Sequence, residues 1–255
     1  MKSIIKFLFI LTIFSSIILN EKKCIAINPE NIPAKFFVKD STEVLKSGTG
    51  FYVHFDSKLF FVTARHNIID STDSLIGNAF TVDIWCDYPQ YMKRSYSFRA
   101  PQLTNTIRIR KIFDNSVFDI AVLYIGEYIP NPYIFSFNLE KEYCPIDSIN
   151  PMQEIVLVGF PFSLIEHEQY DDFRPVIRKG IVSNVYIKEN YIISDILSTT
   201  GDSGSPVITL GNNYLCGVLI KSINKKNHLG FAGIISASIV HGMVKKLNEG
   251  LNENN

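Results

Sequence analysis

The chain has 255 residues, of which 46% are hydrophobic and 20% are charged, a composition typical of a folded protein with a sizeable core. Lysine plus arginine and aspartate plus glutamate both number 25, so the formal net charge is zero. This balance argues against a nucleic-acid or membrane-surface partner that is attracted through bulk charge. The many aromatic and β-branched residues favour strands over helices.

The first residues differ in kind from the rest of the chain. Lys2 and Lys6 precede an apolar run from Phe7 to Leu19, which is shorter than the roughly 20 residues that a spanning helix needs. This pattern predicts a signal peptide and leader over residues 1–26, and therefore a secreted or periplasmic protein without stable membrane insertion. An uncleaved membrane anchor is the alternative.

After a connector with two prolines, the chain consists of short apolar or alternating segments separated by turn residues. About a dozen such segments predict an all-β barrel or sandwich. They span residues 35–39, 50–55, 59–64, 80–85, 106–113, 118–125, 154–160, 174–187, 191–197, 205–210, 214–223 and 230–236. Only residues 237–251 have apolar side chains three and four apart, which predicts a C-terminal helix.

Four prolines between Tyr128 and Pro151 divide the strand segments into two clusters. We therefore predict a first β domain over residues 27–130, a second over 131–240, and a helix end and tail over 241–255.

Two further sets of residues have both a functional and a structural interpretation. The segment 163–173 contains acidic residues and His167, but a solvated surface loop is favoured over a metal site, because no helix or strand fixes the side chains. The four cysteines (Cys24, Cys86, Cys144 and Cys216) form no CxxC pair, which argues against zinc and redox motifs. They are either disulfide partners or small buried apolar residues. No cofactor or metal is predicted.

Among the five histidines, His66 has the setting of a general base. It follows the apolar segment "LFFVTA" and begins a short turn, which could expose its ring at a strand end. A histidine packed in the core or hydrogen-bonded within the turn is the structural alternative. Asp119 lies in the otherwise apolar segment "VFDIAVLYI", where an unpaired charge would be costly, so it requires a partner such as an imidazole N–H.

Ser203 lies in "LSTTGDSGSPV", between two glycines. Such a stretch forms a tight turn in many proteins, and a serine hydroxyl is a nucleophile only with a base, a group that orients the base, and oxyanion donors.

Together, "TARH", "FDIAVL" and "GDSGSP" resemble the three catalytic blocks of the trypsin-like (chymotrypsin-fold) serine peptidases. The chain order His66, Asp119, Ser203 is that of this family and not that of subtilisins or α/β-hydrolases. "SGTGFYV" at 47–53 and "ILSTTGDSGSPV" are similar to bacterial-type members, a branch that includes the glutamyl endopeptidases and HtrA-type protease domains. The resemblance covers most of residues 34–240.

The resemblance implies two six-stranded antiparallel β-barrels with a C-terminal helix and a site between the barrels. It implies that Ser203 is the nucleophile, His66 the general base, and Asp119 the residue that holds the imidazole tautomer. The backbone N–H groups of Gly201 and Ser203 would form the oxyanion hole. Asp202 would pair either with a basic side chain or with a new N-terminus near Ile27.

The sequence departs from the animal members of this family. Asn67 and Thr199 stand where those have cysteines, which again resembles the bacterial-type branch. For the specificity pocket, Leu197 aligns with the floor where trypsins place an aspartate, and Leu219 aligns where glutamyl endopeptidases place a histidine. We therefore expect a preference for apolar or medium-sized side chains, with Ser198, Lys221 and Ser222 nearby; an inward-pointing Lys221 would reverse this preference.

These observations predict an exported serine endopeptidase that acts on protein or peptide substrates. Two alternatives remain: a catalytically idle relative that binds peptides or a partner in the same cleft, and an esterase or other acyl-transfer enzyme with the same triad.

Overall fold

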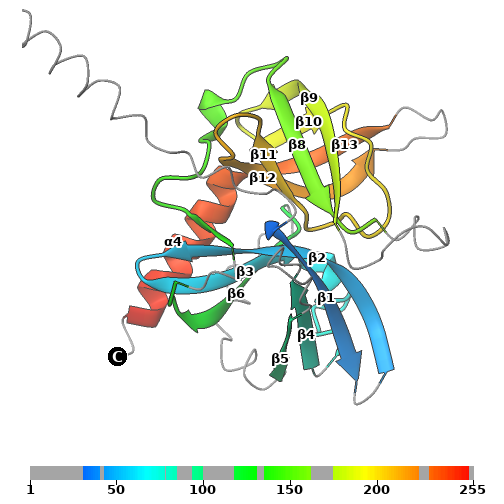
Figure 1. The fold of residues 1–255 in the computed structure, drawn as a ribbon, viewed down its shortest axis with the longest axis vertical. Helices are drawn as coiled ribbons and strands as arrows, with labels where there is room; N and C mark the ends of the chain where they lie inside the picture. The colour runs from blue at the N-terminus through cyan, green and yellow to red at the C-terminus, as the bar shows by residue number, and fades with distance from the viewer. Residues whose placement is uncertain are drawn as a thin grey trace, which may run out of the picture.

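A computed structural model describes residues 31–40, 43–77, 79–84, 94–99, 118–130, 135–161, 175–223 and 230–252. The predicted signal peptide, the loop at 163–173, the segment 106–113, Cys24 and Cys86 lie outside these residues. In the part that is described, two β units lie one above the other, with a single α-helix running along both (Figure 1). No helix in that part is long and apolar enough to cross a membrane.

The first unit is a seven-stranded sheet. Its strands follow the order β5-β4-β1-β2-β3-β6, and a short strand, β7, pairs in parallel with β2. The strands are β1 (Pro33–Asp40), β2 (Glu43–Phe55), β3 (Lys58–Ala64), β4 (Ala79–Ile84), β5 (Arg94–Arg99), β6 (Ile120–Glu127) and β7 (Ser136–Asn138). A 3-10 turn, η2 (Arg65–Asn67), follows β3 directly, and a second, η3 (Ile146–Ser148), lies between the two units along the chain.

The second unit is a closed antiparallel barrel with the strand order β10-β13-β12-β11-β8-β9. Its strands are β8 (Glu154–Gly159), β9 (Val176–Tyr186), β10 (Tyr191–Ser194), β11 (Pro206–Thr209), β12 (Leu215–Ile223) and β13 (Phe231–Ser236). The predicted all-β fold is therefore confirmed. The described strands of the first unit form a sheet with an added parallel strand, and the predicted strand at 106–113 lies outside the described residues.

The sequence of strand β8 is continuously apolar because both faces of the strand are buried. Ile155 and Leu157 point into the barrel, whereas Val156 and Val158 belong to a second hydrophobic cluster, shared with the first sheet and the helix. Because successive strand residues point to opposite faces, a strand with both faces buried needs apolar residues at every position.

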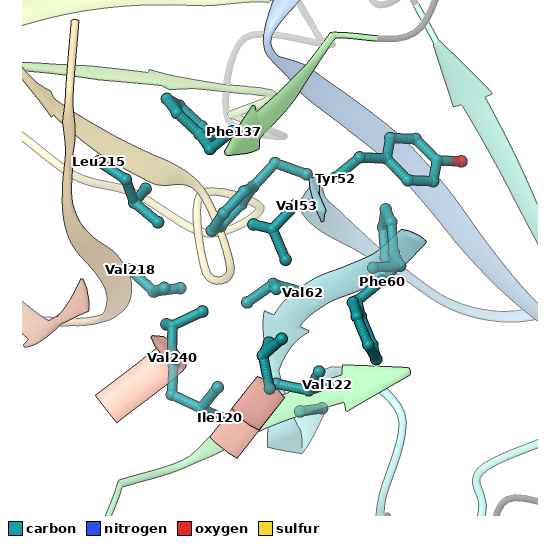
Figure 2. Close-up of a cluster of buried hydrophobic side chains, with 14 of the residues drawn as sticks. Tyr52, Val53, Phe60, Val62, Ile120, Val122, Phe137, Leu215, Val218 and Val240 are labelled. Atoms are coloured by element: carbon teal, nitrogen blue, oxygen red, sulfur yellow. The ribbon is translucent and has the colours of Figure 1, made fainter. Parts of the chain in front are cut away.

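Helix α4 (Ala237–Asn252) packs against strands of both units. Val240, Val244 and Leu247, spaced four and three residues apart, are all buried on one face of the helix. Figure 2 shows Val240 beside Ile120 of β6, with Val218 of β12 approaching from the barrel. Each such aliphatic side chain contributes about 1.5–3 kcal/mol on burial, so this shared core holds the units together.

Candidate active site

The turn η2, which directly follows β3, places His66 facing Asp119, the residue directly before β6. The backbone N–H of His66 donates to Asp119 Oδ1 at 3.0 Å, and His66 Nδ1 lies 2.5 Å from Asp119 Oδ2. The N–H of Arg65 donates to the backbone carbonyl of Asp119 at 2.7 Å. With the carboxylate accepting from Nδ1–H, the lone pair of the imidazole stays on Nε2, which is the nitrogen that a general base uses.

Asp119 has an unusual backbone conformation, with φ of +51°. Aspartate tolerates this left-handed region better than most residues, because its short side chain can hydrogen-bond locally. Here the conformation accompanies three contacts with the η2 turn, one through the backbone carbonyl and two through the carboxylate. The local geometry thus fixes the carboxylate against the imidazole.

A lysine lies behind this pair. The Lys46 ammonium donates to the backbone carbonyl of His66. Burial lowers the pKa of Lys46 from its ordinary value, while the nearby charge of Asp119 raises it. The positive charge of Lys46 thus lies near the Asp119 carboxylate.

Ser203 lies in the loop between β10 and β11. Its hydroxyl donates to the backbone carbonyl of Ile220 on β12 at 3.3 Å. Within the described residues, no hydrogen bond joins the Ser203 hydroxyl to His66.

The loop around Ser203 is a tight turn that depends on glycine. Gly201 and Gly204 have φ of +97° and +89°. A Cβ on Gly204 would lie 2.1 Å from the backbone oxygen of Thr49. The N–H of Gly204 donates to the carbonyl of Leu219 at 2.7 Å, so the turn is held against β12 directly after Ser203. Close approach and positive φ together require glycine at this position.

Asp202, directly before Ser203, is fully buried and pairs with Arg178 of β9. Arg178 Nη1 lies 2.6 Å from Asp202 Oδ2, and Nη2 bonds to Oδ1. The side chain of Asp202 is 0% exposed and that of Arg178 is 15% exposed. The N–H of Thr199 also donates to Asp202 Oδ2, at 2.8 Å. Of the two partners considered for Asp202, the structure therefore shows a basic side chain, which the sequence did not single out.

The five residues assigned to the specificity pocket differ in their burial and contacts. The hydroxyl of Ser222 donates to the backbone carbonyl of Ser198 at 2.9 Å, and the two hydroxyls lie 3.1 Å apart. Leu219 is buried in the core of the barrel, whereas Leu197 is 63% exposed. The Lys221 ammonium lies 5.6 Å from the centre of the Tyr191 ring. Only the two serines are thus joined by hydrogen bonds.

The segment of β12 beside Ser203 has one open edge. Pairing of β11 with β12 ends at Pro206 and Val218, whereas β13 pairs with β12 as far as Ile223. Among the described strands, residues 220–223 therefore have a neighbour on one side only. An open edge can pair with an extended peptide through backbone hydrogen bonds.

Within the described part of the chain, no group of three or more histidine, cysteine, aspartate or glutamate side chains could hold a metal ion.

The sequence is similar to one known protein family. A family model described as a trypsin-like peptidase domain matches residues 48–218, which include His66, Asp119 and Ser203. No curated protein matches the sequence. Since the match covers more than half of the chain, the protein belongs to the family of trypsin-like peptidase domains.

Proposed function

We propose that the protein is an exported serine endopeptidase that hydrolyses peptide bonds through an acyl-enzyme intermediate. The observation that carries this proposal is the pair of hydrogen bonds that the Asp119 carboxylate accepts from the backbone N–H and the ring Nδ1 of His66. A structural histidine needs no such double contact, whereas a general base needs a fixed tautomer and a fixed ring orientation.

In the proposed reaction, the Ser203 hydroxyl leaves the carbonyl of Ile220, gives its proton to His66 Nε2 and attacks the substrate carbonyl carbon. Asp119 stabilises the imidazolium, and the N–H groups of Gly201 and Ser203 donate to the oxyanion. The imidazolium then protonates the leaving amine, and the acyl group remains on Ser203. A water molecule, deprotonated by His66, attacks the acyl-enzyme, which releases the carboxylic acid and restores Ser203.

The open edge of β12 favours a peptide over a small ester as substrate. Residues 220–223 lie beside the nucleophile and can accept an extended chain along the free edge. A small ester makes no use of this edge, so binding energy from it would be specific to peptides.

For the residue before the scissile bond, we propose an apolar or medium-sized side chain. Ser198 and Ser222 form a neutral pair whose hydroxyls bond within the pair. Lys221 directly precedes Ser222, and its ammonium lies over the Tyr191 ring. Lys221 makes no ion pair with a described carboxylate. Cleavage of a peptide library, read by mass spectrometry, tests this preference; selective cleavage after glutamate, aspartate, lysine or arginine contradicts it.

The alternative, an idle cleft that binds peptides, is favoured by one observation: the Ser203 hydroxyl bonds to Ile220 and not to His66. Labelling with a fluorophosphonate probe, read as intact mass, separates the two functions. Stoichiometric labelling that is lost in Ser203→Ala and His66→Ala supports the enzyme. Peptide binding without labelling supports the idle cleft, and hydrolysis of esters but not peptides supports an esterase.

Export is proposed from the basic and apolar pattern of residues 1–26. Expression of the full chain in a secreting host, followed by determination of the N-terminus of the protein outside the cytoplasm, tests it. A full-length chain that stays in the membrane fraction supports the uncleaved anchor instead.

A further inference from the structure

Three polar side chains of the first sheet and its following turn are buried against the loop that carries Ser203. Thr49 of β2 and Thr63 of β3 are 0% exposed, and Asn67 of η2 is 3% exposed. Burying hydroxyl and amide groups is costly unless their hydrogen bonds are made. The hydrogen-bond partners of these three side chains therefore indicate the role of the buried polar groups.

Thr49 contacts the backbone of both residues that would form the oxyanion hole. Its hydroxyl donates to the carbonyl of Gly201 at 2.8 Å and accepts the N–H of Phe160 at 3.1 Å. Its own N–H donates to the carbonyl of Ser203 at 3.4 Å. One residue of the first sheet thus holds the carbonyls on either side of Asp202.

Asn67 makes the second link between the two units. Its amide Nδ2 donates to the carbonyl of Ser203 at 2.9 Å and to Thr63 Oγ1 at 3.2 Å. The Thr63 hydroxyl in turn donates to the backbone carbonyl of Thr49 at 2.7 Å. Because Asn67 directly follows His66, the same turn carries the base and a donor to the nucleophile's own carbonyl.

These bonds restrict the peptide that presents the Ser203 N–H. That peptide lies between the Gly201 and Ser203 carbonyls, and peptide groups are planar, so holding the carbonyls on both sides limits its rotation. Donors that are already aimed at the developing oxyanion need no reorganisation during the reaction. We infer that Thr49 and Asn67 are positioning residues for the oxyanion loop and Ser203; the inference rests on the proposed function.

The test compares Thr49→Val with Thr49→Ser. Valine has nearly the shape of threonine but leaves the Gly201 carbonyl and the Phe160 N–H without a partner, whereas serine keeps the hydroxyl. We expect kcat for a peptide substrate to fall roughly 10- to 100-fold in Thr49→Val, below the loss for a deleted oxyanion donor, with KM changed less than about twofold. Thr49→Ser should restore kcat to within about threefold of the natural protein.

Thr209→Val is the matched control. Thr209 is a buried threonine of β11 whose hydroxyl accepts the N–H of Tyr214 at 3.2 Å, away from the Ser203 loop. It should lower the thermal midpoint and leave kcat unchanged. Equal losses of kcat in Thr209→Val and Thr49→Val would show that the effect is general destabilisation and would overturn the inference.

Two further measurements test the positioning role of Thr49 and Asn67 if Thr49→Val does not fold or the natural protein is inactive. Asn67→Ala should lower kcat while KM changes little. Amide hydrogen exchange reports on the loop without any activity: the N–H groups of Gly204 and Ser205 should exchange faster in Asn67→Ala than in Thr209→Val or Thr49→Ser. Unchanged exchange there overturns the inference, whereas absent activity with faster exchange overturns only the proposed function.

Discussion

At the scale of single residues, two carboxylates of the site each accept hydrogen bonds from a neighbouring side chain. Asp119 accepts from His66, and the fully buried Asp202 pairs with Arg178, because a carboxylate removed from water is costly without a partner. The two pairs have different tasks. The first pair is partly exposed, and in the proposed function it exchanges a proton with the substrate, whereas the second is buried and holds the loop beside Ser203.

Asp119→Asn should leave the fold intact and lower kcat by a factor on the order of 10⁴, because asparagine cannot hold the imidazole in the tautomer that leaves Nε2 free. The measurement is kcat and the thermal midpoint of unfolding for Asp119→Asn and the natural protein. Lys46→Met serves as comparison, since it removes the neighbouring charge but not the hydrogen bonds of Asp119 to His66. A similar loss in both variants would contradict the tautomer argument.

Arg178→Met should cost about 3–5 kcal/mol of stability, because it leaves the fully buried Asp202 carboxylate unpaired. Adding Asp202→Asn should recover part of this loss, since the unpaired charge is then gone. Denaturant unfolding of the single and double variants measures the coupling. Lys179→Met, next to Arg178 but with an exposed ion pair to Glu154, should change stability by less than about 1 kcal/mol. Additive losses in the double variant would contradict the pairing argument.

At the scale of elements, the Ser203 turn is defined by what surrounds Gly204. A side chain there meets the backbone of Thr49 and the Thr63 hydroxyl, at 2.1 Å and 2.4 Å. The turn and β2 can approach this closely only because position 204 has no Cβ.

Gly204→Ala should therefore lower both stability and activity, and Gly211→Ala is its control. Both glycines have positive φ, +89° and +99°, so both alanine variants bear a conformational cost of roughly 1–2 kcal/mol. Nothing lies within 4 Å of a Cβ at Gly211, so that variant lacks the steric term. Thermal unfolding and fluorophosphonate labelling should show the larger loss for Gly204→Ala. Equal losses would mean that the contact with β2 is unimportant.

At the scale of the whole molecule, two histidines lie near the junction of the first sheet, the connecting segment and α4. His54 stacks on Tyr128 with ring centres 4.0 Å apart, and His241 stacks on Tyr143 at 4.7 Å. Burial lowers the pKa of His54, against the opposing effects of Glu142 and Glu140. Burial and then Lys245 lower the pKa of His241. Both side chains thus favour the neutral form in the folded protein.

Stability should consequently depend on pH below about 6.5, the ordinary histidine pKa. Because the folded-state pKa values of the two histidines are lowered, the unfolded chain binds protons at a higher pH than the folded protein does. The contribution of the histidines to folding stability is therefore complete above about pH 6.5 and is lost as the pH falls through their folded-state pKa values. Thermal midpoints between pH 7.5 and 5 should fall, and fall less in His54→Gln/His241→Gln. Asp70, whose pKa is lowered by Thr72 and Ser74, titrates below this window. Identical pH profiles for the two proteins would contradict this assignment.

Most of the strands follow from local sequence, whereas β5 and β7 were not among the predicted segments. Alternating and continuous apolar runs predicted the strands, since side-chain burial repeats with the geometry of the element itself. Asp119 was noticeable because a charge in an apolar strand demands a partner. The partners of Asp202 and Ser203 were not predictable in this way: Arg178 is 24 residues from Asp202, and Asn67 is 136 residues from Ser203.

By itself, the sequence determined the β class, the C-terminal helix and a family resemblance that the match over residues 48–218 confirms. Only the tertiary structure decided that Thr49, Asn67 and Arg178 hold the Ser203 loop, and that Leu219 packs inside the barrel. The physical reason is range: periodicity and turn chemistry are read within a few residues, whereas a buried hydrogen bond joins whichever groups the packed strands bring together.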